Sequence, residues 1–349
     1  MFKRIIVPLD GSTRAEQSIA VAVRIAHASK GSIFLLRVVT VPFEIGSQVV
    51  PLSGFSSTTL ENDINTATHY LAAIARRDEF DGIGLKLKVL TGTAARKIQD
   101  VVEDEQADLI VMCSHGDTGI KRFMLGSVAQ KVARHSTVPV LVLRQDGSVP
   151  VSSYPDQLRP LRAVMAVVAL DGSTLAEASL LPAASLVIAL AAPARGSLQL
   201  TRVVKLPIKV RGSGKQDNLN YPESTVMHTA DQAIRDAKTY LGNLVDYLRQ
   251  GLLKDADLTL TWSVALGKDV AKTLIKVAET GEDVEGSDIF GGGDLLVLTT
   301  HGGGGPERLM PGSVTEHILG ATRLPMLIVR PKEQHAQTST ASVQVEARR

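Results

Sequence analysis

The sequence predicts an α/β protein built from two doubly wound domains, each with a five-stranded parallel sheet. Short apolar runs alternate with stretches of helical periodicity along the chain, which is the pattern of βαβ units. Four blocks of the first half also return in the same order in the second half, as expected of a tandem duplication. The length of 349 residues is about twice the ~150 of a typical single domain.

Matched blocks define the repeat. The block Asp10-Gly11-Ser12-Thr13 returns as Asp171-Gly172-Ser173-Thr174, "GSIFLLRVV" returns as "GSLQLTRVV", "ADLIVMCSHG" returns as "GDLLVLTTHG", and "TVPVLVLR" returns as "RLPMLIVR". The distance between matched residues grows from 161 at Asp10 and Asp171 to 186 at His115 and His301. The second half therefore carries extra residues in its loops. Two insertions stand out: a longer first helix, and the acidic, glycine-rich segment 279–294.

Each element of the first half follows from its local pattern. Short apolar or alternating runs predict strands, and apolar residues every three or four positions predict helices. Strands are expected at 4–9, 32–39, 85–90, 109–112 and 138–143, and helices at 15–28, 61–77, 94–105 and 127–135. Right-handed crossovers between such strands leave a five-stranded doubly wound layer as the natural arrangement.

The chain divides into four expected segments. They are a first domain at 1–145, a linker rich in serine and proline at 146–160, a second domain at 161–331 and a polar tail at 332–349. The tail has few apolar residues, so we expect it to be disordered.

Composition bears on which partners and which cellular compartment to expect. The chain has 38 Lys and Arg against 36 Asp and Glu, so nothing favours nucleic acid as its partner. Cys113 is the only cysteine, which excludes an intrachain disulfide and a cysteine-based zinc cluster. The uncharged run 178–194 contains two prolines and is predicted to be a buried helix rather than a membrane span. The N-terminal residues lack signal-peptide features, and we expect a cytoplasmic protein.

The candidate site lies where strands end. In doubly wound sheets, ligands bind outside the carboxyl ends of the strands where the strand order reverses. There the first half places Asp10, Val39 and the loop 113–127. Gly126 and Ser127 lie at a predicted helix start, where free N–H groups and the helix dipole favour an anion. Glycine permits close approach and positive φ, and the carboxylate of Asp10 can accept hydrogen bonds from a ribose or an amino group.

These residues also have a purely structural interpretation. Ser127 can cap the following helix, Gly126 can be a turn residue, and Asp10 can cap the first helix beside Glu16 in a sequence close to a capping box. A single glycine loop would favour this interpretation. Its recurrence at equal spacing favours anion binding.

The loop spacing carries a family resemblance. Gly116, nine residues and then Gly126-Ser127 in the first half are matched by Gly302, nine residues and then Gly312-Ser313 in the second. In these motifs each half resembles a universal stress protein domain, and the chain resembles a tandem member of that family. The resemblance implies layering like that of flavodoxin and the adenine nucleotide α-hydrolases. It also implies an intramolecular pseudo-dimer made through the last strands, with further dimerisation open to it.

The resemblance also implies ATP as a bound effector, with magnesium carried on its phosphates. The nucleotide-binding residues it implies are Pro8, Asp10, Val39, Cys113, Gly116, Gly126, Ser127 and Val128 in the first half, and Asp171, Val204, Thr299, Gly302, Gly312, Ser313 and Val314 in the second. Cys113 and Thr299 replace the first glycine of the family signature, and Pro311 removes an N–H donor. The first half is therefore the better expected ATP site.

Three functions remain open. The first is a cytoplasmic stress-response regulator that binds an adenine nucleotide and an unidentified protein partner. The second is an interaction scaffold without nucleotide, and the third is a weak ATP hydrolase. Catalysis is not expected, because no activated nucleophile or base is visible and the loop "LDGST" is poor in glycine. A protein-built metal site is not expected either, because His115 and His301 lack partners at ligand spacing.

Overall fold

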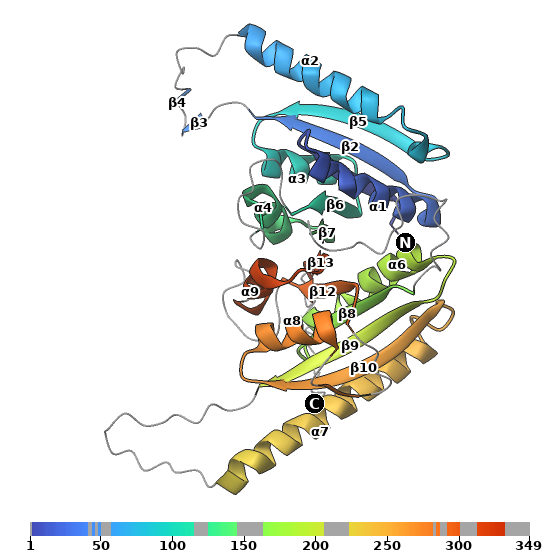
Figure 1. Cartoon of the computed structure of the whole chain (residues 1–349), viewed down its shortest axis with the longest axis vertical. Coiled ribbons are helices and arrows are strands. Elements are labelled where there is room, and N and C mark those ends of the chain that lie inside the picture. Colours follow the sequence, from blue (N-terminus) through green and yellow to red (C-terminus); the bar gives the residue numbers. More distant parts are fainter. Residues whose placement is uncertain are drawn as a thin grey trace, which may run out of the picture.

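The structure is a computed structural model that describes residues 2–40, 57–114, 125–144, 163–205, 223–281, 292–300 and 313–331, and the backbone of three short strands at 44–45, 48–49 and 284–286. The predicted linker and tail, and the site residues Gly116, Gly302 and Gly312, lie outside these ranges. Figure 1 shows two α/β halves that follow one another along the long axis of the molecule.

The first half has the predicted order of elements. They are β1 (Arg4–Leu9), α1 (Thr13–Ser29), β2 (Ser32–Val39), the small strands β3 (Glu44–Ile45) and β4 (Gln48–Val49), α2 (Ser57–Ile74), the 3₁₀ turn η1 (Asp78–Phe80), β5 (Gly84–Thr91), α3 (Ala94–Asp104), β6 (Leu109–Cys113), α4 (Ser127–His135) and β7 (Val140–Leu143). Their strands are parallel in the order β5-β2-β1-β6-β7. The strand order reverses between β1 and β6, so a ligand site is expected there.

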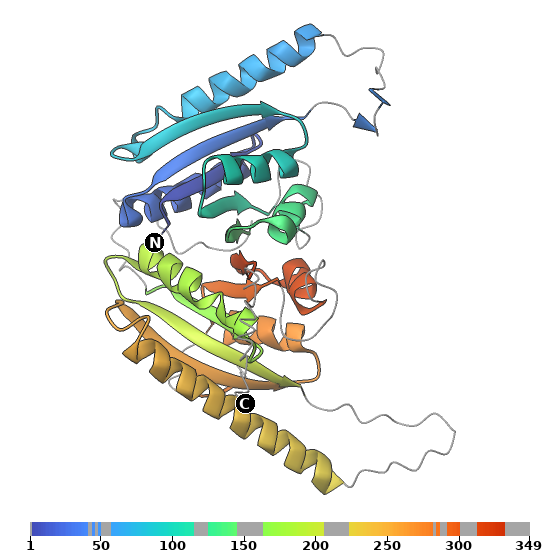
Figure 2. The same ribbon diagram turned by 180° about the vertical axis from the view of Figure 1, so that it is seen from behind.

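The second half repeats this arrangement with additions. It contains β8 (Met165–Leu170), α5 (Thr174–Glu177), α6 (Leu180–Ala191), β9 (Gly196–Lys205), α7 (Glu223–Gln250), β10 (Leu258–Gly267), α8 (Val270–Thr280), β11 (Val284–Gly286), β12 (Leu295–Thr299), α9 (Ser313–Ala321) and β13 (Met326–Val329). Its parallel strands follow the order β10-β9-β8-β12-β13. The helices α2 and α7 lie over the outer strands at opposite ends of the molecule (Figure 2).

The two halves share one sheet. The strand β13 pairs antiparallel with β7, so that Leu327 lies opposite Leu141 and Met326 opposite Val142. Through this pair eleven of the described strands form one sheet, while β3 and β4 pair only with each other. The predicted intramolecular pseudo-dimer, made through the last strand of each half, is confirmed.

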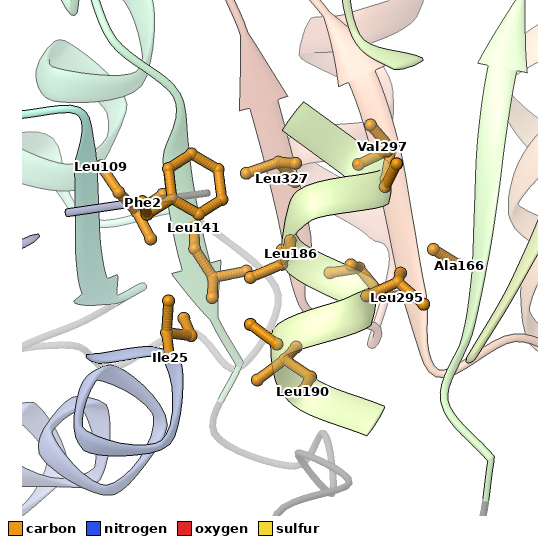
Figure 3. Packing of buried hydrophobic residues seen from close by; sticks show 14 of the residues in the cluster. Phe2, Ile25, Leu109, Leu141, Ala166, Leu186, Leu190, Leu295, Val297 and Leu327 are labelled. Carbon is orange, nitrogen blue, oxygen red and sulfur yellow. The ribbon is translucent and has the colours of Figure 1, made fainter. Parts of the chain in front are cut away.

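A continuous core crosses the junction on one face of the sheet. Helix α1 packs against α6, and Ile25, Leu141, Leu186 and Leu327 belong to one buried cluster. Figure 3 shows these side chains converging from both halves. Arg24 donates from Nε to the carbonyl of Leu190 at 2.6 Å, at the carboxyl end of α6. One half therefore caps the helix end of the other.

Polar contacts join the halves on the opposite face. Arg134 in the last turn of α4 pairs with Glu316 in the first turn of α9. Arg144, which follows β7 and is buried, donates to the carbonyl of Leu319 near the end of α9. Burial lowers the pKa of Arg144 to about 10.

The structures of the two predicted insertions in the second half differ from the expected ones. The first helix is not simply longer but divided, because α5 ends at Glu177 and α6 begins at Leu180. The segment at 279–294 contributes β11, an added strand antiparallel to β10, so the second sheet is not five-stranded and wholly parallel. A third enlargement, not anticipated, is α7, with 28 residues against 18 in α2.

The apolar run around α6 is a core helix, as predicted. The stretch 174–191 has a mean hydropathy of 1.7 and meets the length and composition of a membrane span, but 56% of it is buried in the protein. Most side chains of α6 lie in the core, and Leu181 is its exposed exception at 49%.

Candidate functional site

A cavity of about 950 Å³ opens at the carboxyl ends of β1, β2 and β6, beside the point where the strand order reverses. The predicted site residues of the first half that line it are Pro8, Asp10, Val39, Cys113, Gly126, Ser127 and Val128. Every described site residue predicted for the first half is therefore brought together in one cavity. Its size is in the range of small-molecule sites, roughly 300–1,000 Å³.

The turn after β1 holds Asp10 in place. The carboxylate oxygen Oδ1 accepts hydrogen bonds from the N–H of Ser12 at 3.0 Å and from its hydroxyl at 2.6 Å. The hydroxyl oxygen of Ser12 in turn accepts from the N–H of Ala15 at 3.1 Å. The helix cap is thus Ser12, and the interpretation of Asp10 as the cap is wrong. Asp10 supports the cap and presents a fixed carboxylate to the cavity.

The start of α4 forms another wall. Gly126 is its N-cap residue with φ −60, and Ser127 is the first helical residue, so the interpretation of Ser127 as N-cap is wrong. Gly126 does not use positive φ either. Its N–H donates to the carbonyl of Ser114 at 2.7 Å. Among the residues that the structure describes, no side-chain hydrogen bond caps this helix, and its first turn lines the cavity, which leaves a helix N-terminus directed at whatever the cavity holds.

Two large side chains of the cavity were missed from the sequence. Arg37 donates from Nη1 to the carbonyl of Leu9 at 3.3 Å and lies against Gly11, where a Cβ atom would meet the guanidinium at 3.4 Å. Tyr70 of α2 donates its hydroxyl hydrogen to Oε1 of Glu16 at 3.1 Å. Burial and the Glu16 carboxylate raise the pKa of Tyr70, so it stays neutral at physiological pH.

Glu16 does not complete a capping box. Its other oxygen, Oε2, pairs with Arg77 at 2.6 Å. The carboxylate therefore ties α1 to α2 and to the turn beyond it, rather than returning to the start of its own helix. The tyrosine contact recurs in the second half, where Tyr240 donates to Glu177 at 2.7 Å. Arg202, which holds the position of Arg37, lies 5.4 Å from the Tyr240 ring. Comparing the two halves position by position could have revealed these residues.

Comparisons with known proteins agree with this architecture. The family model described as the universal stress protein family matches residues 1–144. A universal stress protein of Methanocaldococcus jannaschii is 30% identical over 145 residues, which are 42% of this chain and 84% of the relative. The chain belongs to the universal stress protein family.

Other relatives fit this assignment. A second universal stress protein of M. jannaschii is 29% identical over 160 residues, covering 42% of this chain and 98% of the relative. The crystal structure of a universal stress protein from Archaeoglobus fulgidus aligns with this one at a TM-score of 0.57 and 19% identity. The aligned part covers 94% of this chain and 96% of the A. fulgidus chain. That likeness is one of fold, and it extends over both halves.

In this universal stress protein, Cys113 takes the place of the first signature glycine and packs against the core. Its Sγ lies 2.8 Å from the carbonyl oxygen of Arg14 and donates to it. Burial raises the pKa of the thiol to about 12. A thiol that stays protonated at neutral pH is a poor nucleophile, so Cys113 is suited to packing in the core rather than to redox sensing.

We therefore expect slow alkylation of Cys113 in the folded universal stress protein. At pH 8 the thiol of the native chain should react with iodoacetamide at least about tenfold more slowly than that of the urea-unfolded chain, whose pKa returns to about 8.5. Mass spectrometry of quenched samples follows the reaction, because the chain has no other cysteine. Equal rates in the two states would show that the thiol is accessible and ionised.

The second half of this universal stress protein keeps the scaffold of the site. Asp171 Oδ1 accepts from the N–H and hydroxyl of Ser173 at 2.9 and 2.6 Å, as Asp10 does from Ser12. Val204, one residue before the end of β9, is buried, and so is Thr299 at the end of β12. Ser313 begins α9, and Val314 packs against the core.

Bulkier side chains stand in the second site. By the buried faces of the helices, Val270 replaces Ala94 and Thr315 replaces Ala129. The Thr315 hydroxyl is buried and donates to the carbonyl of Thr299 at 3.0 Å. This bond draws the start of α9 to the end of β12, so the counterpart of the cavity holds more protein atoms.

Within the described ranges, no group of three or more His, Cys, Asp or Glu side chains is arranged to hold a metal ion. His115 and His301, weighed in the sequence as ligands, lie outside those ranges.

Proposed function

We propose that this universal stress protein is a cytoplasmic stress-response regulator that binds ATP or another adenine nucleotide as an effector through its first half. The observation that carries the proposal is the cavity itself. It combines a fixed carboxylate, Asp10, with the helix start at Gly126 and Ser127. A nucleotide carries groups that match each, because its hydroxyl and amino groups donate hydrogen bonds and its phosphates are anionic.

Different parts of the cavity would bind different groups of such a ligand. The helix start would bind phosphate through backbone N–H groups and the hydroxyl of Ser127. The apolar wall, which includes Val39, Ile98 and Met112, would cover the base. Magnesium, where present, would be carried on the phosphates. The ligand would act by shifting the population of conformations of the protein rather than by reacting.

The proposal is tested by calorimetric titration of MgATP into protein freed of co-purified nucleotide. We expect binding with a stoichiometry near one, because the second site is occupied by the larger Val270 and Thr315 side chains. A stoichiometry near two would contradict the assignment to one half. If nothing binds at millimolar nucleotide, the chain is a scaffold. Release of ADP or AMP at a multiple-turnover rate would instead make it a hydrolase.

A further inference from the structure

The strand β5 forms one end of the eleven-stranded sheet. Among the described residues it pairs only with β2, over its whole length from Gly84 to Thr91. It is also accessible, since the side chains of Lys86 and Leu87 are 67% and 43% exposed. A long, open edge of this kind can accept a further strand.

The backbone N–H and C=O groups of β5 alternate between the side of β2 and the open edge. The N–H of Gly92 donates to the carbonyl of Val39, so Gly92 is directed toward β2. Successive residues of a strand direct their N–H and C=O groups to opposite sides. Leu85, Leu87 and Val89 therefore direct theirs away from β2, along the open edge.

In the second half, the strand that corresponds to β5 is β10, and its outer edge is paired with β11. Ser32 and Ser197 are matched residues, and they pair with Gly84 and Thr259. By this register, Val264 corresponds to Val89. Strand β11 pairs antiparallel there, with Glu285 opposite Val264.

The covered edge is buried in consequence. Ser263, Val264 and Ala265 are at most 2% exposed, whereas their counterparts Lys88, Val89 and Leu90 are all partly exposed. In the second half, the strand that corresponds to β5 therefore accepts a further strand, and that strand runs antiparallel to it.

The charge of the β5 edge indicates which kind of strand could pair with it. Lys86 and Lys88 project from β5 and share one carboxylate, Glu105, at 3.2 and 2.9 Å. Two cations with one anion leave a positive surplus along the edge. A second copy of β5 would bring lysine close to lysine, which is unfavourable across a strand pair. An acidic strand would meet the surplus favourably, and the strand used in the second half lies in an acidic segment.

We propose that the outer edge of β5 is a docking site for an extended acidic segment of a partner protein, bound antiparallel by β-augmentation. Backbone groups of Leu85, Leu87 and Val89 would supply the hydrogen bonds. Lys86 and Lys88 would select carboxylates, and Leu87 would contact an apolar side chain of the partner. The site is independent of the cavity and does not rest on nucleotide binding.

The test uses the full chain and a fluorescent peptide of residues 281–290, "GEDVEGSDIF", as the acidic probe. We expect saturable binding by fluorescence anisotropy. The Lys86→Gln/Lys88→Gln variant should bind about fivefold more weakly, since two exposed ion pairs are lost. The matched control Lys131→Gln/Lys254→Gln changes two exposed lysines elsewhere and should bind normally. Leu87→Pro, which removes one outward N–H, should weaken binding at least about tenfold.

Hydrogen exchange tests the proposal in the wild-type protein, so the result does not depend on whether the Leu87→Pro variant folds. In wild-type protein the peptide should slow amide exchange in 84–91 and leave 258–267 unchanged. The proposal is overturned if the peptide does not bind at millimolar concentration, or if a probe with its acidic residues changed to Asn and Gln binds equally well. It is also overturned if the protein self-associates in a way that Leu87→Pro abolishes, because the occupant is then a second copy.

Discussion

The double variant Ala94→Val/Ala129→Thr is expected to bind ATP at least about tenfold more weakly than the wild type, a loss of about 1.4 kcal/mol. Both alanines line the cavity, and Ala129 is only 2% exposed. The added atoms either take up ligand space or force the walls apart, and overpacking of this kind costs about 1–3 kcal/mol. The same calorimetric titration measures the effect. The new side chains are those that the chain already carries at matched positions, so the fold should be kept.

The reciprocal variant is the control. Val270→Ala/Thr315→Ala removes the same atoms from the second half and should leave the affinity of the first site unchanged. Unchanged affinity in the first-half variant would place the nucleotide outside the cavity. Loss of affinity in the second-half variant would show that the site is not confined to the first half.

The substitution Leu186→Ala should lower the free energy of unfolding by about 2–5 kcal/mol. Leu186 is fully buried, in a cluster that includes Leu141 of the first half and Leu327 of the second (Figure 3). Because the core and the sheet cross the junction, both halves should lose stability together. Urea unfolding followed by circular dichroism should show one transition, shifted to lower urea.

Leu181→Ala is the matched control on the same helix. Leu181 is 49% exposed, and the same chemical change there should cost less than about 0.5 kcal/mol. Two separate transitions, with the substitution at Leu186 moving only one of them, would contradict a shared core. The halves would then unfold as independent units.

Local patterns in the sequence were enough to predict the repeated βαβ order, whereas the pairing of the halves was implied by the resemblance to the universal stress protein family. The strands β1 and β2 and the helix α4 lie at their predicted residues. Strand β11 could not be predicted, because the segment 279–294 has no apolar alternation and owes its strand to pairing with β10. The division of α5 from α6 was also hidden, since Ala178 and Ser179 at the break are neither glycine nor proline.

The candidate site was only partly visible in the sequence. Asp10, Gly126 and Ser127 lie in recognisable turns, and the structure brings them together in one cavity. Arg37 and Tyr70 come from a strand and a helix with unremarkable patterns, and only the packing of α2 over β2 directs them there. The turn chemistry was also misassigned, because Ser12 and Gly126 hold the cap positions expected for Asp10 and Ser127.

The short helix α4 has a mechanical consequence. It begins at the cavity with Ser127, and in its last turn Arg134 pairs with Glu316 on α9. Nine residues at about 1.5 Å each make a strut of about 13 Å, too short to bend appreciably. A displacement of its first turn is therefore expected to move its last turn as well. Since α9 begins at the residue matched to Ser127, the strut links the ligand-facing turn of one half to the corresponding turn of the other.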